Sequence, residues 1–312
     1  MSATTAQGHG AKPDEMPRVS IIVPTYRDWP RAQLCLDALA RQSYPAERTE
    51  IFIVNNDPDD PPPDDLRVPD NCTLLTEAAN GSYAARNRGL AAASGDVMMF
   101  TDADCTPVDE WCKAMVACLQ ENPNLSRMGG RINMLPGANT GSVAYAYERC
   151  FSMEQELYVS QGWAATANMA AWTRVFAEIG PFEATHFSGG DSEWGLRAHR
   201  AGHAIGYCPI ARIDHPARDR HEIAVKYRRI QGARLRRKLG AGGGVYATLY
   251  FVYHALRRIL IPPGSPIARL AALSETPLHV RIATYFFVYY LRVSVVVDQA
   301  RILFFKGAPE RR

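Results

Sequence analysis

The sequence predicts an α/β fold in which a mainly parallel sheet is flanked by helices. Short apolar runs alternate with segments of helical composition, which is the pattern of strands joined by helical crossovers. The first run, VSIIVPTY from Val19, is apolar and ends in proline, as expected for a strand that is buried on both faces. With 312 residues and 47% hydrophobic composition, the chain can bury a large core, which excludes a disordered or fibrous protein.

The first half of the chain supplies most of this pattern. A helix is expected at 29–42 after the first strand, and IFIVNN at 51–56 is a second strand closed by the turn-forming DPDDPPPDD. CTLLTE at 72–77 is a third strand, and an alanine-rich helix is expected at 83–93. DVMMFTDAD at 96–104 is a fourth strand with acidic residues at its carboxyl end, where open α/β sheets place their ligands.

The alternation weakens after this point. A strand is expected at 131–135, a helical stretch at 145–158, a helix that begins after the glycine pair of GGDSEWGLRAHRAG, and a strand at 203–209. Two apolar helices follow at 245–261 and 278–305, with a hinge in the GAGGG stretch that ends at Gly244. We therefore divide the chain into a polar, disordered leader (1–17), an α/β domain (18–216) and a basic, apolar helical extension (217–312).

The charge is divided unevenly along the chain. Residues 1–210 hold 16 basic and 26 acidic side chains, a net charge of −10, whereas residues 211–312 hold 19 basic and 6 acidic side chains, a net charge of +13. Such asymmetry indicates an anionic partner for the carboxyl-terminal part. The aromatic residues there and the lack of any nucleic-acid motif favour a membrane surface over nucleic acid.

The cysteines and the first residues predict a cytoplasmic protein. The seven cysteines form no CxxC pair and no zinc spacing, and their odd number fits free, mostly buried thiols in a reducing compartment. The leader lacks the apolar run of a secretory signal. Together with the basic extension, this predicts a cytoplasmic protein that is peripheral on the inner face of the membrane.

Four motifs in this order carry a resemblance to a known family. They are VSIIVPTY, the AARNRG stretch, FTDAD and GGDSEWGLR. Over residues 18–216 the chain resembles glycosyltransferase family 2, a family of inverting enzymes with the Rossmann-like GT-A fold, and in particular its bacterial polysaccharide and cell-envelope members. The resemblance implies transfer of a sugar from a nucleotide-sugar.

Asp102 and Asp104 of TDAD are the candidate metal ligands. Their spacing at the end of a strand lets both carboxylates reach one site, and the breaking glycosidic bond needs a cation to neutralise the leaving diphosphate. Oxygen ligands favour Mg²⁺ or Mn²⁺. In the family the last aspartate binds the metal most directly and the first assists at metal or ribose. His215 matches a further ligand of some relatives, although a structural role is the alternative.

The resemblance also suggests a nucleotide pocket over the ends of the first strands. Pro24, Thr25 and Tyr26 would shape it, and Arg86 would reach the diphosphate or ribose unless it is a helix-surface residue. The family usually has an aspartate that accepts a hydrogen bond from uracil, and this chain has Asn55 instead. Because an amide can accept as well as donate, recognition of a UDP-sugar stays open.

Asp191 matches the family's general base, which would deprotonate the acceptor hydroxyl during inversion. The family often has an acidic residue just before this aspartate, whereas this chain has Gly190. The alternative for Asp191 is a helix N-cap.

Candidate acceptor contacts lie around this residue. They are Glu193, Trp194, Thr166 and Asn168. For Thr166 and Asn168, packing is the alternative.

The extension can dock on a membrane in more than one way. Its last apolar helix is interrupted by Arg292 and Asp298 and barely reaches the length of about 20 residues that a span needs. Monotopic or hairpin association on an anionic leaflet is therefore expected. A helical cap on the catalytic domain, or a dimer partner that would make the protein a homo-oligomer, is the alternative.

The leading prediction is thus an inverting, metal-dependent transferase that uses a UDP-type donor and a glycan or polyprenyl-linked acceptor, with no nucleic acid partner. One alternative is a nucleotidyltransferase that makes nucleotide-sugars. Such an enzyme needs a glycine-rich, basic phosphate loop after the first strand, and PTYRDWP at that place is not one. The other is a membrane-docked nucleotide-sugar scaffold without turnover, against which the three aspartates argue.

Overall fold

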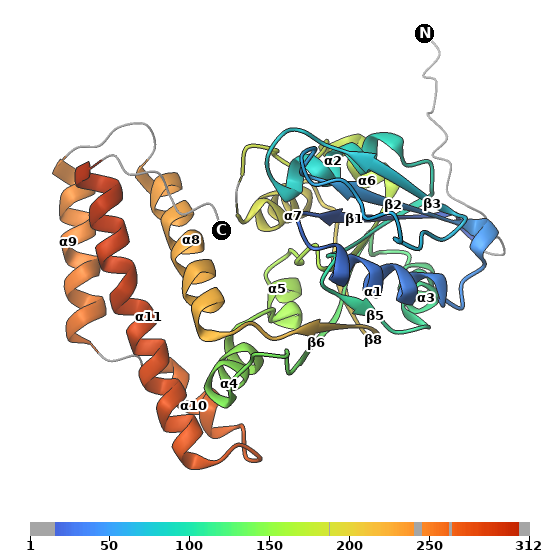
Figure 1. Cartoon of the computed structure of the whole chain (residues 1–312). Coiled ribbons are helices and arrows are strands. Elements are labelled where there is room, and N and C mark those ends of the chain that lie inside the picture. Colours follow the sequence, from blue (N-terminus) through green and yellow to red (C-terminus); the bar gives the residue numbers. More distant parts are fainter. Residues whose placement is uncertain (1–15, 187, 240–244, 262–263, 306–312) are drawn as a thin grey trace, which may run out of the picture. The chain divides into compact units, whose positions relative to one another are not determined.

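The computed structural model describes residues 16–186, 188–239, 245–261 and 264–305 (Figure 1). The predicted hinge at 240–244 and nearly all of the predicted leader lie outside these residues. The chain divides into two compact units. Unit 1 comprises residues 1–132, 155–186 and 190–214, and unit 2 comprises residues 133–154, 187–189 and 215–312.

The predicted parallel strands are confirmed in unit 1. They are β1 (Val19–Thr25), β2 (Thr49–Asn55), β3 (Cys72–Thr76) and β4 (Val97–Thr101). β1 lies between β2 and β4, and β3 lies outside β2, with every pair parallel. The four predicted runs therefore form one half of the sheet with their carboxyl ends at one edge.

The other half of the sheet makes it mixed. Its strands are β7 (Asn168–Trp172), β6 (Arg127–Leu135), β8 (Ile205–Pro216) and β5 (Thr106–Pro107), and the whole order is β3-β2-β1-β4-β7-β6-β8-β5. β7 pairs antiparallel with β4 and with β6, and β5 pairs antiparallel with β8. The strand predicted at 203–209 is thus the beginning of a longer one.

Both faces of the sheet in unit 1 are covered, which explains the uninterrupted apolar runs. Val19, Ile21 and Val23 of β1 lie in one buried cluster and Ile22 lies in another. The helices and the short 3₁₀ turn of unit 1 are α1 (Trp29–Ala40), η1 (Ala46–Arg48), α2 (Ser82–Ala92), α3 (Trp111–Glu121), α5 (Gln155–Ser160), α6 (Thr173–Ile179) and α7 (Gly190–Arg200).

The helical stretch predicted at 145–158 is helical but divided. The structure has two helices, α4 (Ser142–Phe151) in unit 2 and α5 in unit 1. The chain between them passes through Met153 with φ of 51°, a left-handed conformation that a continuing helix does not allow.

Unit 2 is helical. Besides α4 it contains α8 (Arg220–Leu239), α9 (Val245–Leu260), α10 (Ser265–Ala271) and the long α11 (Leu278–Phe305) (Figure 1). Ala144 and Tyr147 of α4, Ile223 of α8 and Leu291 of α11 share one buried cluster. The two apolar helices predicted for this part are confirmed, whereas α8 was anticipated only as a basic stretch.

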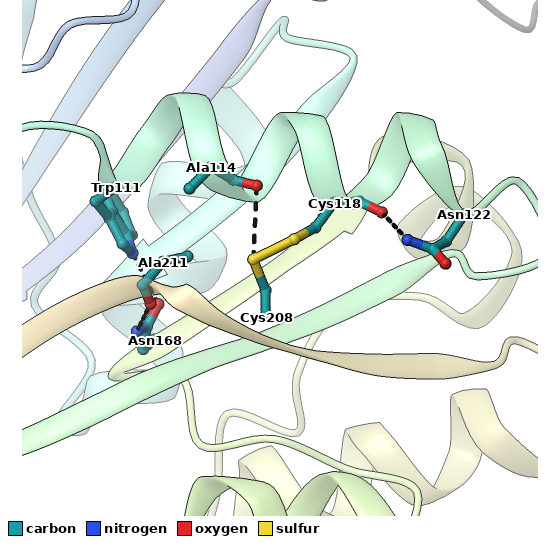
Figure 2. Close-up of a disulfide and its surroundings, with 7 residues drawn as sticks. All are labelled: Trp111, Ala114, Cys118, Asn122, Asn168, Cys208 and Ala211. Carbon is teal, nitrogen blue, oxygen red and sulfur yellow. Dashed lines mark hydrogen bonds between the residues drawn. A yellow bond between two sulfur atoms is a disulfide. The ribbon is translucent and has the colours of Figure 1, made fainter.

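A disulfide joins Cys118 of α3 to Cys208 of β8 within unit 1 (Figure 2). The expectation that all cysteines are free is therefore wrong for this pair, because two residues 90 positions apart meet where α3 packs on the sheet. The other cysteines are free, and all of them except Cys72 are buried.

Candidate active site

The acidic pair lies at the carboxyl edge of the sheet in unit 1. Asp102 directly follows β4, and Asp104 comes two residues later. Both are partly exposed, while Ala103 between them is buried. The carboxylates therefore emerge next to the end of β1, where the parallel strands would receive a ligand.

Arg86 forms an ion pair with Asp102. It belongs to α2, and a Cβ on Gly89 of that helix would lie 2.6 Å from the Ile22 side chain, so the glycine lets α2 pack closely on β1. The Arg86 side chain is only 4% exposed, which rules out a helix-surface role. Its guanidinium also lies 5.4 Å from the centroid of the Tyr83 ring, in cation–π contact.

Asp191 lies in the first turn of α7, close to Tyr83. Its Oδ1 accepts a hydrogen bond of 3.2 Å from the Tyr83 hydroxyl and one of 2.8 Å from the Ser192 amide. Burial raises the pKa of the Asp191 carboxyl, and the Ser192 amide and nearby Arg86 oppose that rise. Because a carboxyl group with a raised pKa is a stronger proton acceptor, this environment suits a general base.

The Tyr83 ring explains why this chain has Gly190 where the family often has an acidic residue. A Cβ at Gly190 would lie 2.8 Å from the Tyr83 ring, closer than real Cβ contacts come. An acidic side chain before Asp191 would therefore displace the tyrosine that holds the base. Tyr83 itself was not anticipated, although its place three residues before Arg86 puts both side chains on one helix face.

Several buried polar atoms near this edge have no hydrogen-bond partner among the described residues. They are Oγ1 of Thr25 at the end of β1, Oγ1 of Thr101 at the end of β4, and Nε of Arg86. Buried polar groups are normally satisfied, so these unsatisfied atoms at the carboxyl ends of the strands fit an edge that is built for a polar ligand. The carboxylates of Asp102 and Asp104 beside them provide the oxygen ligands that Mg²⁺ and Mn²⁺ prefer.

The residues after β1 and β2 form a second polar group. Tyr26 is exposed, and the Arg27 guanidinium lies 5.3 Å from its ring centroid. Arg27 has a left-handed φ of 52° and forms an ion pair with Asp57, which lies just beyond β2. That hydrogen bond lowers the pKa of Asp57, so this carboxylate stays ionised.

Asn55 is occupied by its own loop. Its Nδ2 donates to the carbonyl oxygens of Asp57 and Asp60, each at 2.9 Å, and its Oδ1 accepts from the Asp57 amide at 3.0 Å. Both amide hydrogens are thus used, and the side chain is buried. The arrangement shapes the loop after β2 and gives no support to a contact between Asn55 and a base.

Two predicted acceptor residues on α7 are held by other contacts. Trp194 is fully buried, stacks on Phe176 with ring centroids 4.3 Å apart, and donates to the Gly180 carbonyl oxygen. It therefore packs in the core and offers no open face to a sugar. Glu193 is partly exposed and forms an ion pair of 2.8 Å with Arg197.

Thr166 and Asn168 are both buried. The Asn168 amide accepts from the Trp111 indole and donates to the Ala211 carbonyl oxygen (Figure 2). It also donates to the Arg131 carbonyl oxygen, so it ties three strands of the sheet together. The packing alternative thus has direct support for Asn168, and its acceptor role has none.

His215 lies at the end of β8, as the first residue of unit 2 after Asp214. Its side chain is buried, and its Nδ1 lies 2.7 Å from the Pro216 carbonyl oxygen. Arg218 approaches the other ring nitrogen at 3.4 Å. If Nδ1 carries the proton, it donates to that carbonyl oxygen, and Nε2 accepts from Arg218.

Comparisons with known proteins decide the family. Residues 20–175 match the profile described as Glycosyl transferase family 2. Glycosyltransferase AglE of Haloferax volcanii is 32% identical over 221 residues, which cover 69% of this chain and 72% of AglE. The chain belongs to glycosyl transferase family 2. This family 2 member is a glycosyltransferase that moves a sugar from a nucleotide-sugar, and its assignment sets aside the nucleotidyltransferase and scaffold alternatives.

Solved structures agree on the fold of this family 2 member. One is the mannosyltransferase PcManGT from Pyrobaculum calidifontis in complex with GDP-Man and Mn²⁺, with a TM-score of 0.54, 17% identity, and coverage of 95% of this chain and 89% of that one. Another is S. aureus TarS 1-349 in complex with UDP, with a TM-score of 0.51, 16% identity, and coverage of 91% and 92%. The GT-A fold is thereby confirmed.

Proposed function

We propose that this chain is an inverting, divalent-metal-dependent glycosyltransferase that moves a sugar from a UDP-type donor to a glycan or a polyprenyl-linked acceptor. One observation carries the proposal. Asp102, Arg86, Tyr83 and Asp191 form a continuous set of contacts at the carboxyl edge of the sheet. A residue suited to the leaving group is thereby connected to a residue suited to the attacking hydroxyl.

Asp102, Asp104 and Arg86 are the proposed diphosphate side of the site. Mg²⁺ or Mn²⁺ held by the two carboxylates would supply positive charge to the leaving diphosphate. The Mn²⁺ in the PcManGT complex supports this ion type. His215 is proposed as a further ligand, because Thr106, two residues after Asp104, pairs with Asp214, the neighbour of His215.

Asp191 is the proposed general base. It takes the proton from the acceptor hydroxyl as the oxygen attacks the anomeric carbon on the face opposite the leaving diphosphate, which inverts the configuration. Tyr83 fixes the carboxylate through one oxygen. The same oxygen accepts the Ser192 amide, so the second oxygen is the one proposed to take the proton.

Base recognition is proposed to use the loop after β2, with Pro24, Thr25 and Tyr26 as the neighbouring wall. Since Oδ1 of Asn55 already accepts from the Asp57 amide, the ionised Asp57 carboxylate is proposed as the acceptor for a base N–H. Arg27 beside it could donate to a base carbonyl oxygen. Uracil presents an N–H next to a carbonyl group, and the UDP complex of TarS supports this donor type.

A panel of nucleoside diphosphates and nucleotide-sugars, measured by thermal shift with and without Mn²⁺, tests the donor half of the proposal. UDP or a UDP-sugar should raise Tm only with Mn²⁺, by an amount equivalent to about 3 kcal/mol at a hundredfold excess over Kd. Asp104→Asn should abolish the shift, whereas Asp109→Asn, an exposed carboxylate just before α3, should keep it. An equal shift without metal would contradict the metal dependence.

A further inference from the structure

The outer sides of α9 and α11 in unit 2 carry a row of exposed apolar side chains. We call this set the apolar face, and it consists of Val252, Leu256, Ile259 and Leu260 of α9 with Ile282, Phe286, Tyr290 and Val297 of α11. The spacing is that of one stripe on each helix. Exposed fractions of 52% at Leu256 and 63% at Phe286 show that these are not edges of a buried core.

Polar residues that interrupt the same helices are paired inside unit 2. Asp298 of α11 forms an ion pair of 3.2 Å with Arg228 of α8. Gln299 accepts from Arg258 of α9 at 2.7 Å, and the Tyr289 hydroxyl donates to the backbone of α9. The charge of Asp298 in α11 is thus neutralised within the helical unit.

The charge of this region selects the occupant of the apolar face. Residues 211–312 carry a net charge of +13, so two copies that approached each other through this region would repel. An anionic lipid surface attracts the same charge and accepts the apolar side chains. We infer that the apolar face inserts into one leaflet of an anionic membrane.

Insertion in one leaflet fits α11 better than a span does. Leu278–Ala300 is long and apolar enough to cross a membrane by length and composition, and 22% of its apolar window is buried in the protein. Arg292 lies well inside that stretch and Asp298 lies near its end, and a span would carry Arg292 into the hydrocarbon. An in-plane helix keeps these groups at the interface while Phe286 and Tyr290 enter the leaflet.

Flotation of the full chain with vesicles tests this inference without relying on transfer activity. The probes are vesicles of phosphatidylcholine and vesicles of phosphatidylcholine mixed with phosphatidylglycerol. The full chain should float with the anionic vesicles. Leu256→Gln combined with Phe286→Gln should lower the partition coefficient at least about tenfold. Leu34→Gln with Ile210→Gln removes two comparably exposed apolar side chains from unit 1 and should leave flotation unchanged.

Each other outcome overturns the inference. Absence of flotation overturns it, and a self-associated chain in that case assigns the apolar face to a second copy. Equal flotation of the α9/α11 variant and the full chain overturns the choice of this face. Retention after an alkaline carbonate wash, with a label on α11 reached from the vesicle lumen, overturns the one-leaflet arrangement in favour of a span. Thermal unfolding of each variant confirms that it is folded.

Discussion

Burial raises the pKa of the Asp191 carboxyl, and the Tyr83 hydroxyl donates a hydrogen bond to it. The raised pKa makes the carboxylate a stronger base, but it lowers the stability of the folded protein at neutral pH. Burial disfavours the charge of Asp191, so the folded protein binds this proton more tightly than the unfolded chain does. By linkage, the free energy of unfolding therefore falls as pH rises from the unfolded pKa through the higher folded pKa. Ionisation of Asp191 therefore lowers the free energy of unfolding at neutral pH.

Asp191→Asn should separate these consequences. Transfer should fall by about 10²- to 10⁴-fold, because the amide cannot accept the proton. Stability at neutral pH should be equal to or above that of the parent, since the desolvated charge is gone. Single-turnover kinetics and denaturant unfolding measure the two effects. Asp109→Asn, at an exposed site, is the control, and near-normal transfer by folded Asp191→Asn would refute the role as base.

Tyr83→Phe should keep the ring over which Arg86 lies and remove only the hydroxyl. Because that hydrogen bond lowers the pKa of Asp191, its loss should move the acid limb of the kcat profile to higher pH. The value of kcat should fall up to about tenfold, and KM for the donor should not change. Tyr44→Phe removes another buried hydroxyl bond, to the Pro17 carbonyl oxygen, and should leave the profile in place. An unshifted profile in Tyr83→Phe would show that the hydroxyl only packs.

At the scale of elements, the strands and site residues that could be predicted are those with a clear apolar pattern or a place in a motif. The parallel strands were recognised because both faces are buried, and Asp102, Arg86 and Asp191 were found because they stand in motifs. Tyr83 and Asp191 are 108 residues apart, so no local pattern could pair them. The same holds for the Arg27–Asp57 pair, which depends on the ends of two strands meeting.

The beginning of β6 was missed for a different reason. The strand was predicted to begin at Arg131, yet Gly129 and Gly130 already lie in it. A Cβ on Gly130 would lie 2.4 Å from the Ala211 carbonyl oxygen and 2.5 Å from the Asn168 amide. The glycine is thus required by the close approach of Asn168 and β8, which is tertiary information.

The disulfide between α3 and β8 is an element-scale feature that stabilises unit 1. Closing a loop of this length should stabilise unit 1 by about 2–4 kcal/mol. Cys118→Ala with Cys208→Ala should lower Tm accordingly, and so should reduction of the parent. The reductant should have no effect on Tm of the double variant, which serves as the control. A parent whose Tm is insensitive to a reductant that frees both thiols would contradict this contribution.

At the scale of the whole molecule, the charge distribution separates the part proposed for catalysis from the part proposed for membrane attachment. The acidic first 210 residues contain the proposed base and, except for His215, the proposed donor residues, and the basic remainder contains the apolar face. Negative charge on the catalytic part opposes its own contact with an anionic leaflet, whereas positive charge on the helical part favours it. Membrane attachment and chemistry can then be altered separately.

This separation predicts how the acceptor's location affects transfer. The variant with Leu256→Gln and Phe286→Gln should transfer sugar to a water-soluble acceptor at the parental rate. With a polyprenyl-linked acceptor in anionic vesicles it should lose most of its activity, because the enzyme no longer concentrates at the lipid surface. Raising the salt concentration should likewise lower the parent's rate of transfer to the vesicle-bound acceptor. The variant with Leu34→Gln and Ile210→Gln should match the parent on both acceptors. Equal losses on soluble and vesicle-bound acceptors would instead mean that α9 and α11 support the catalytic residues themselves.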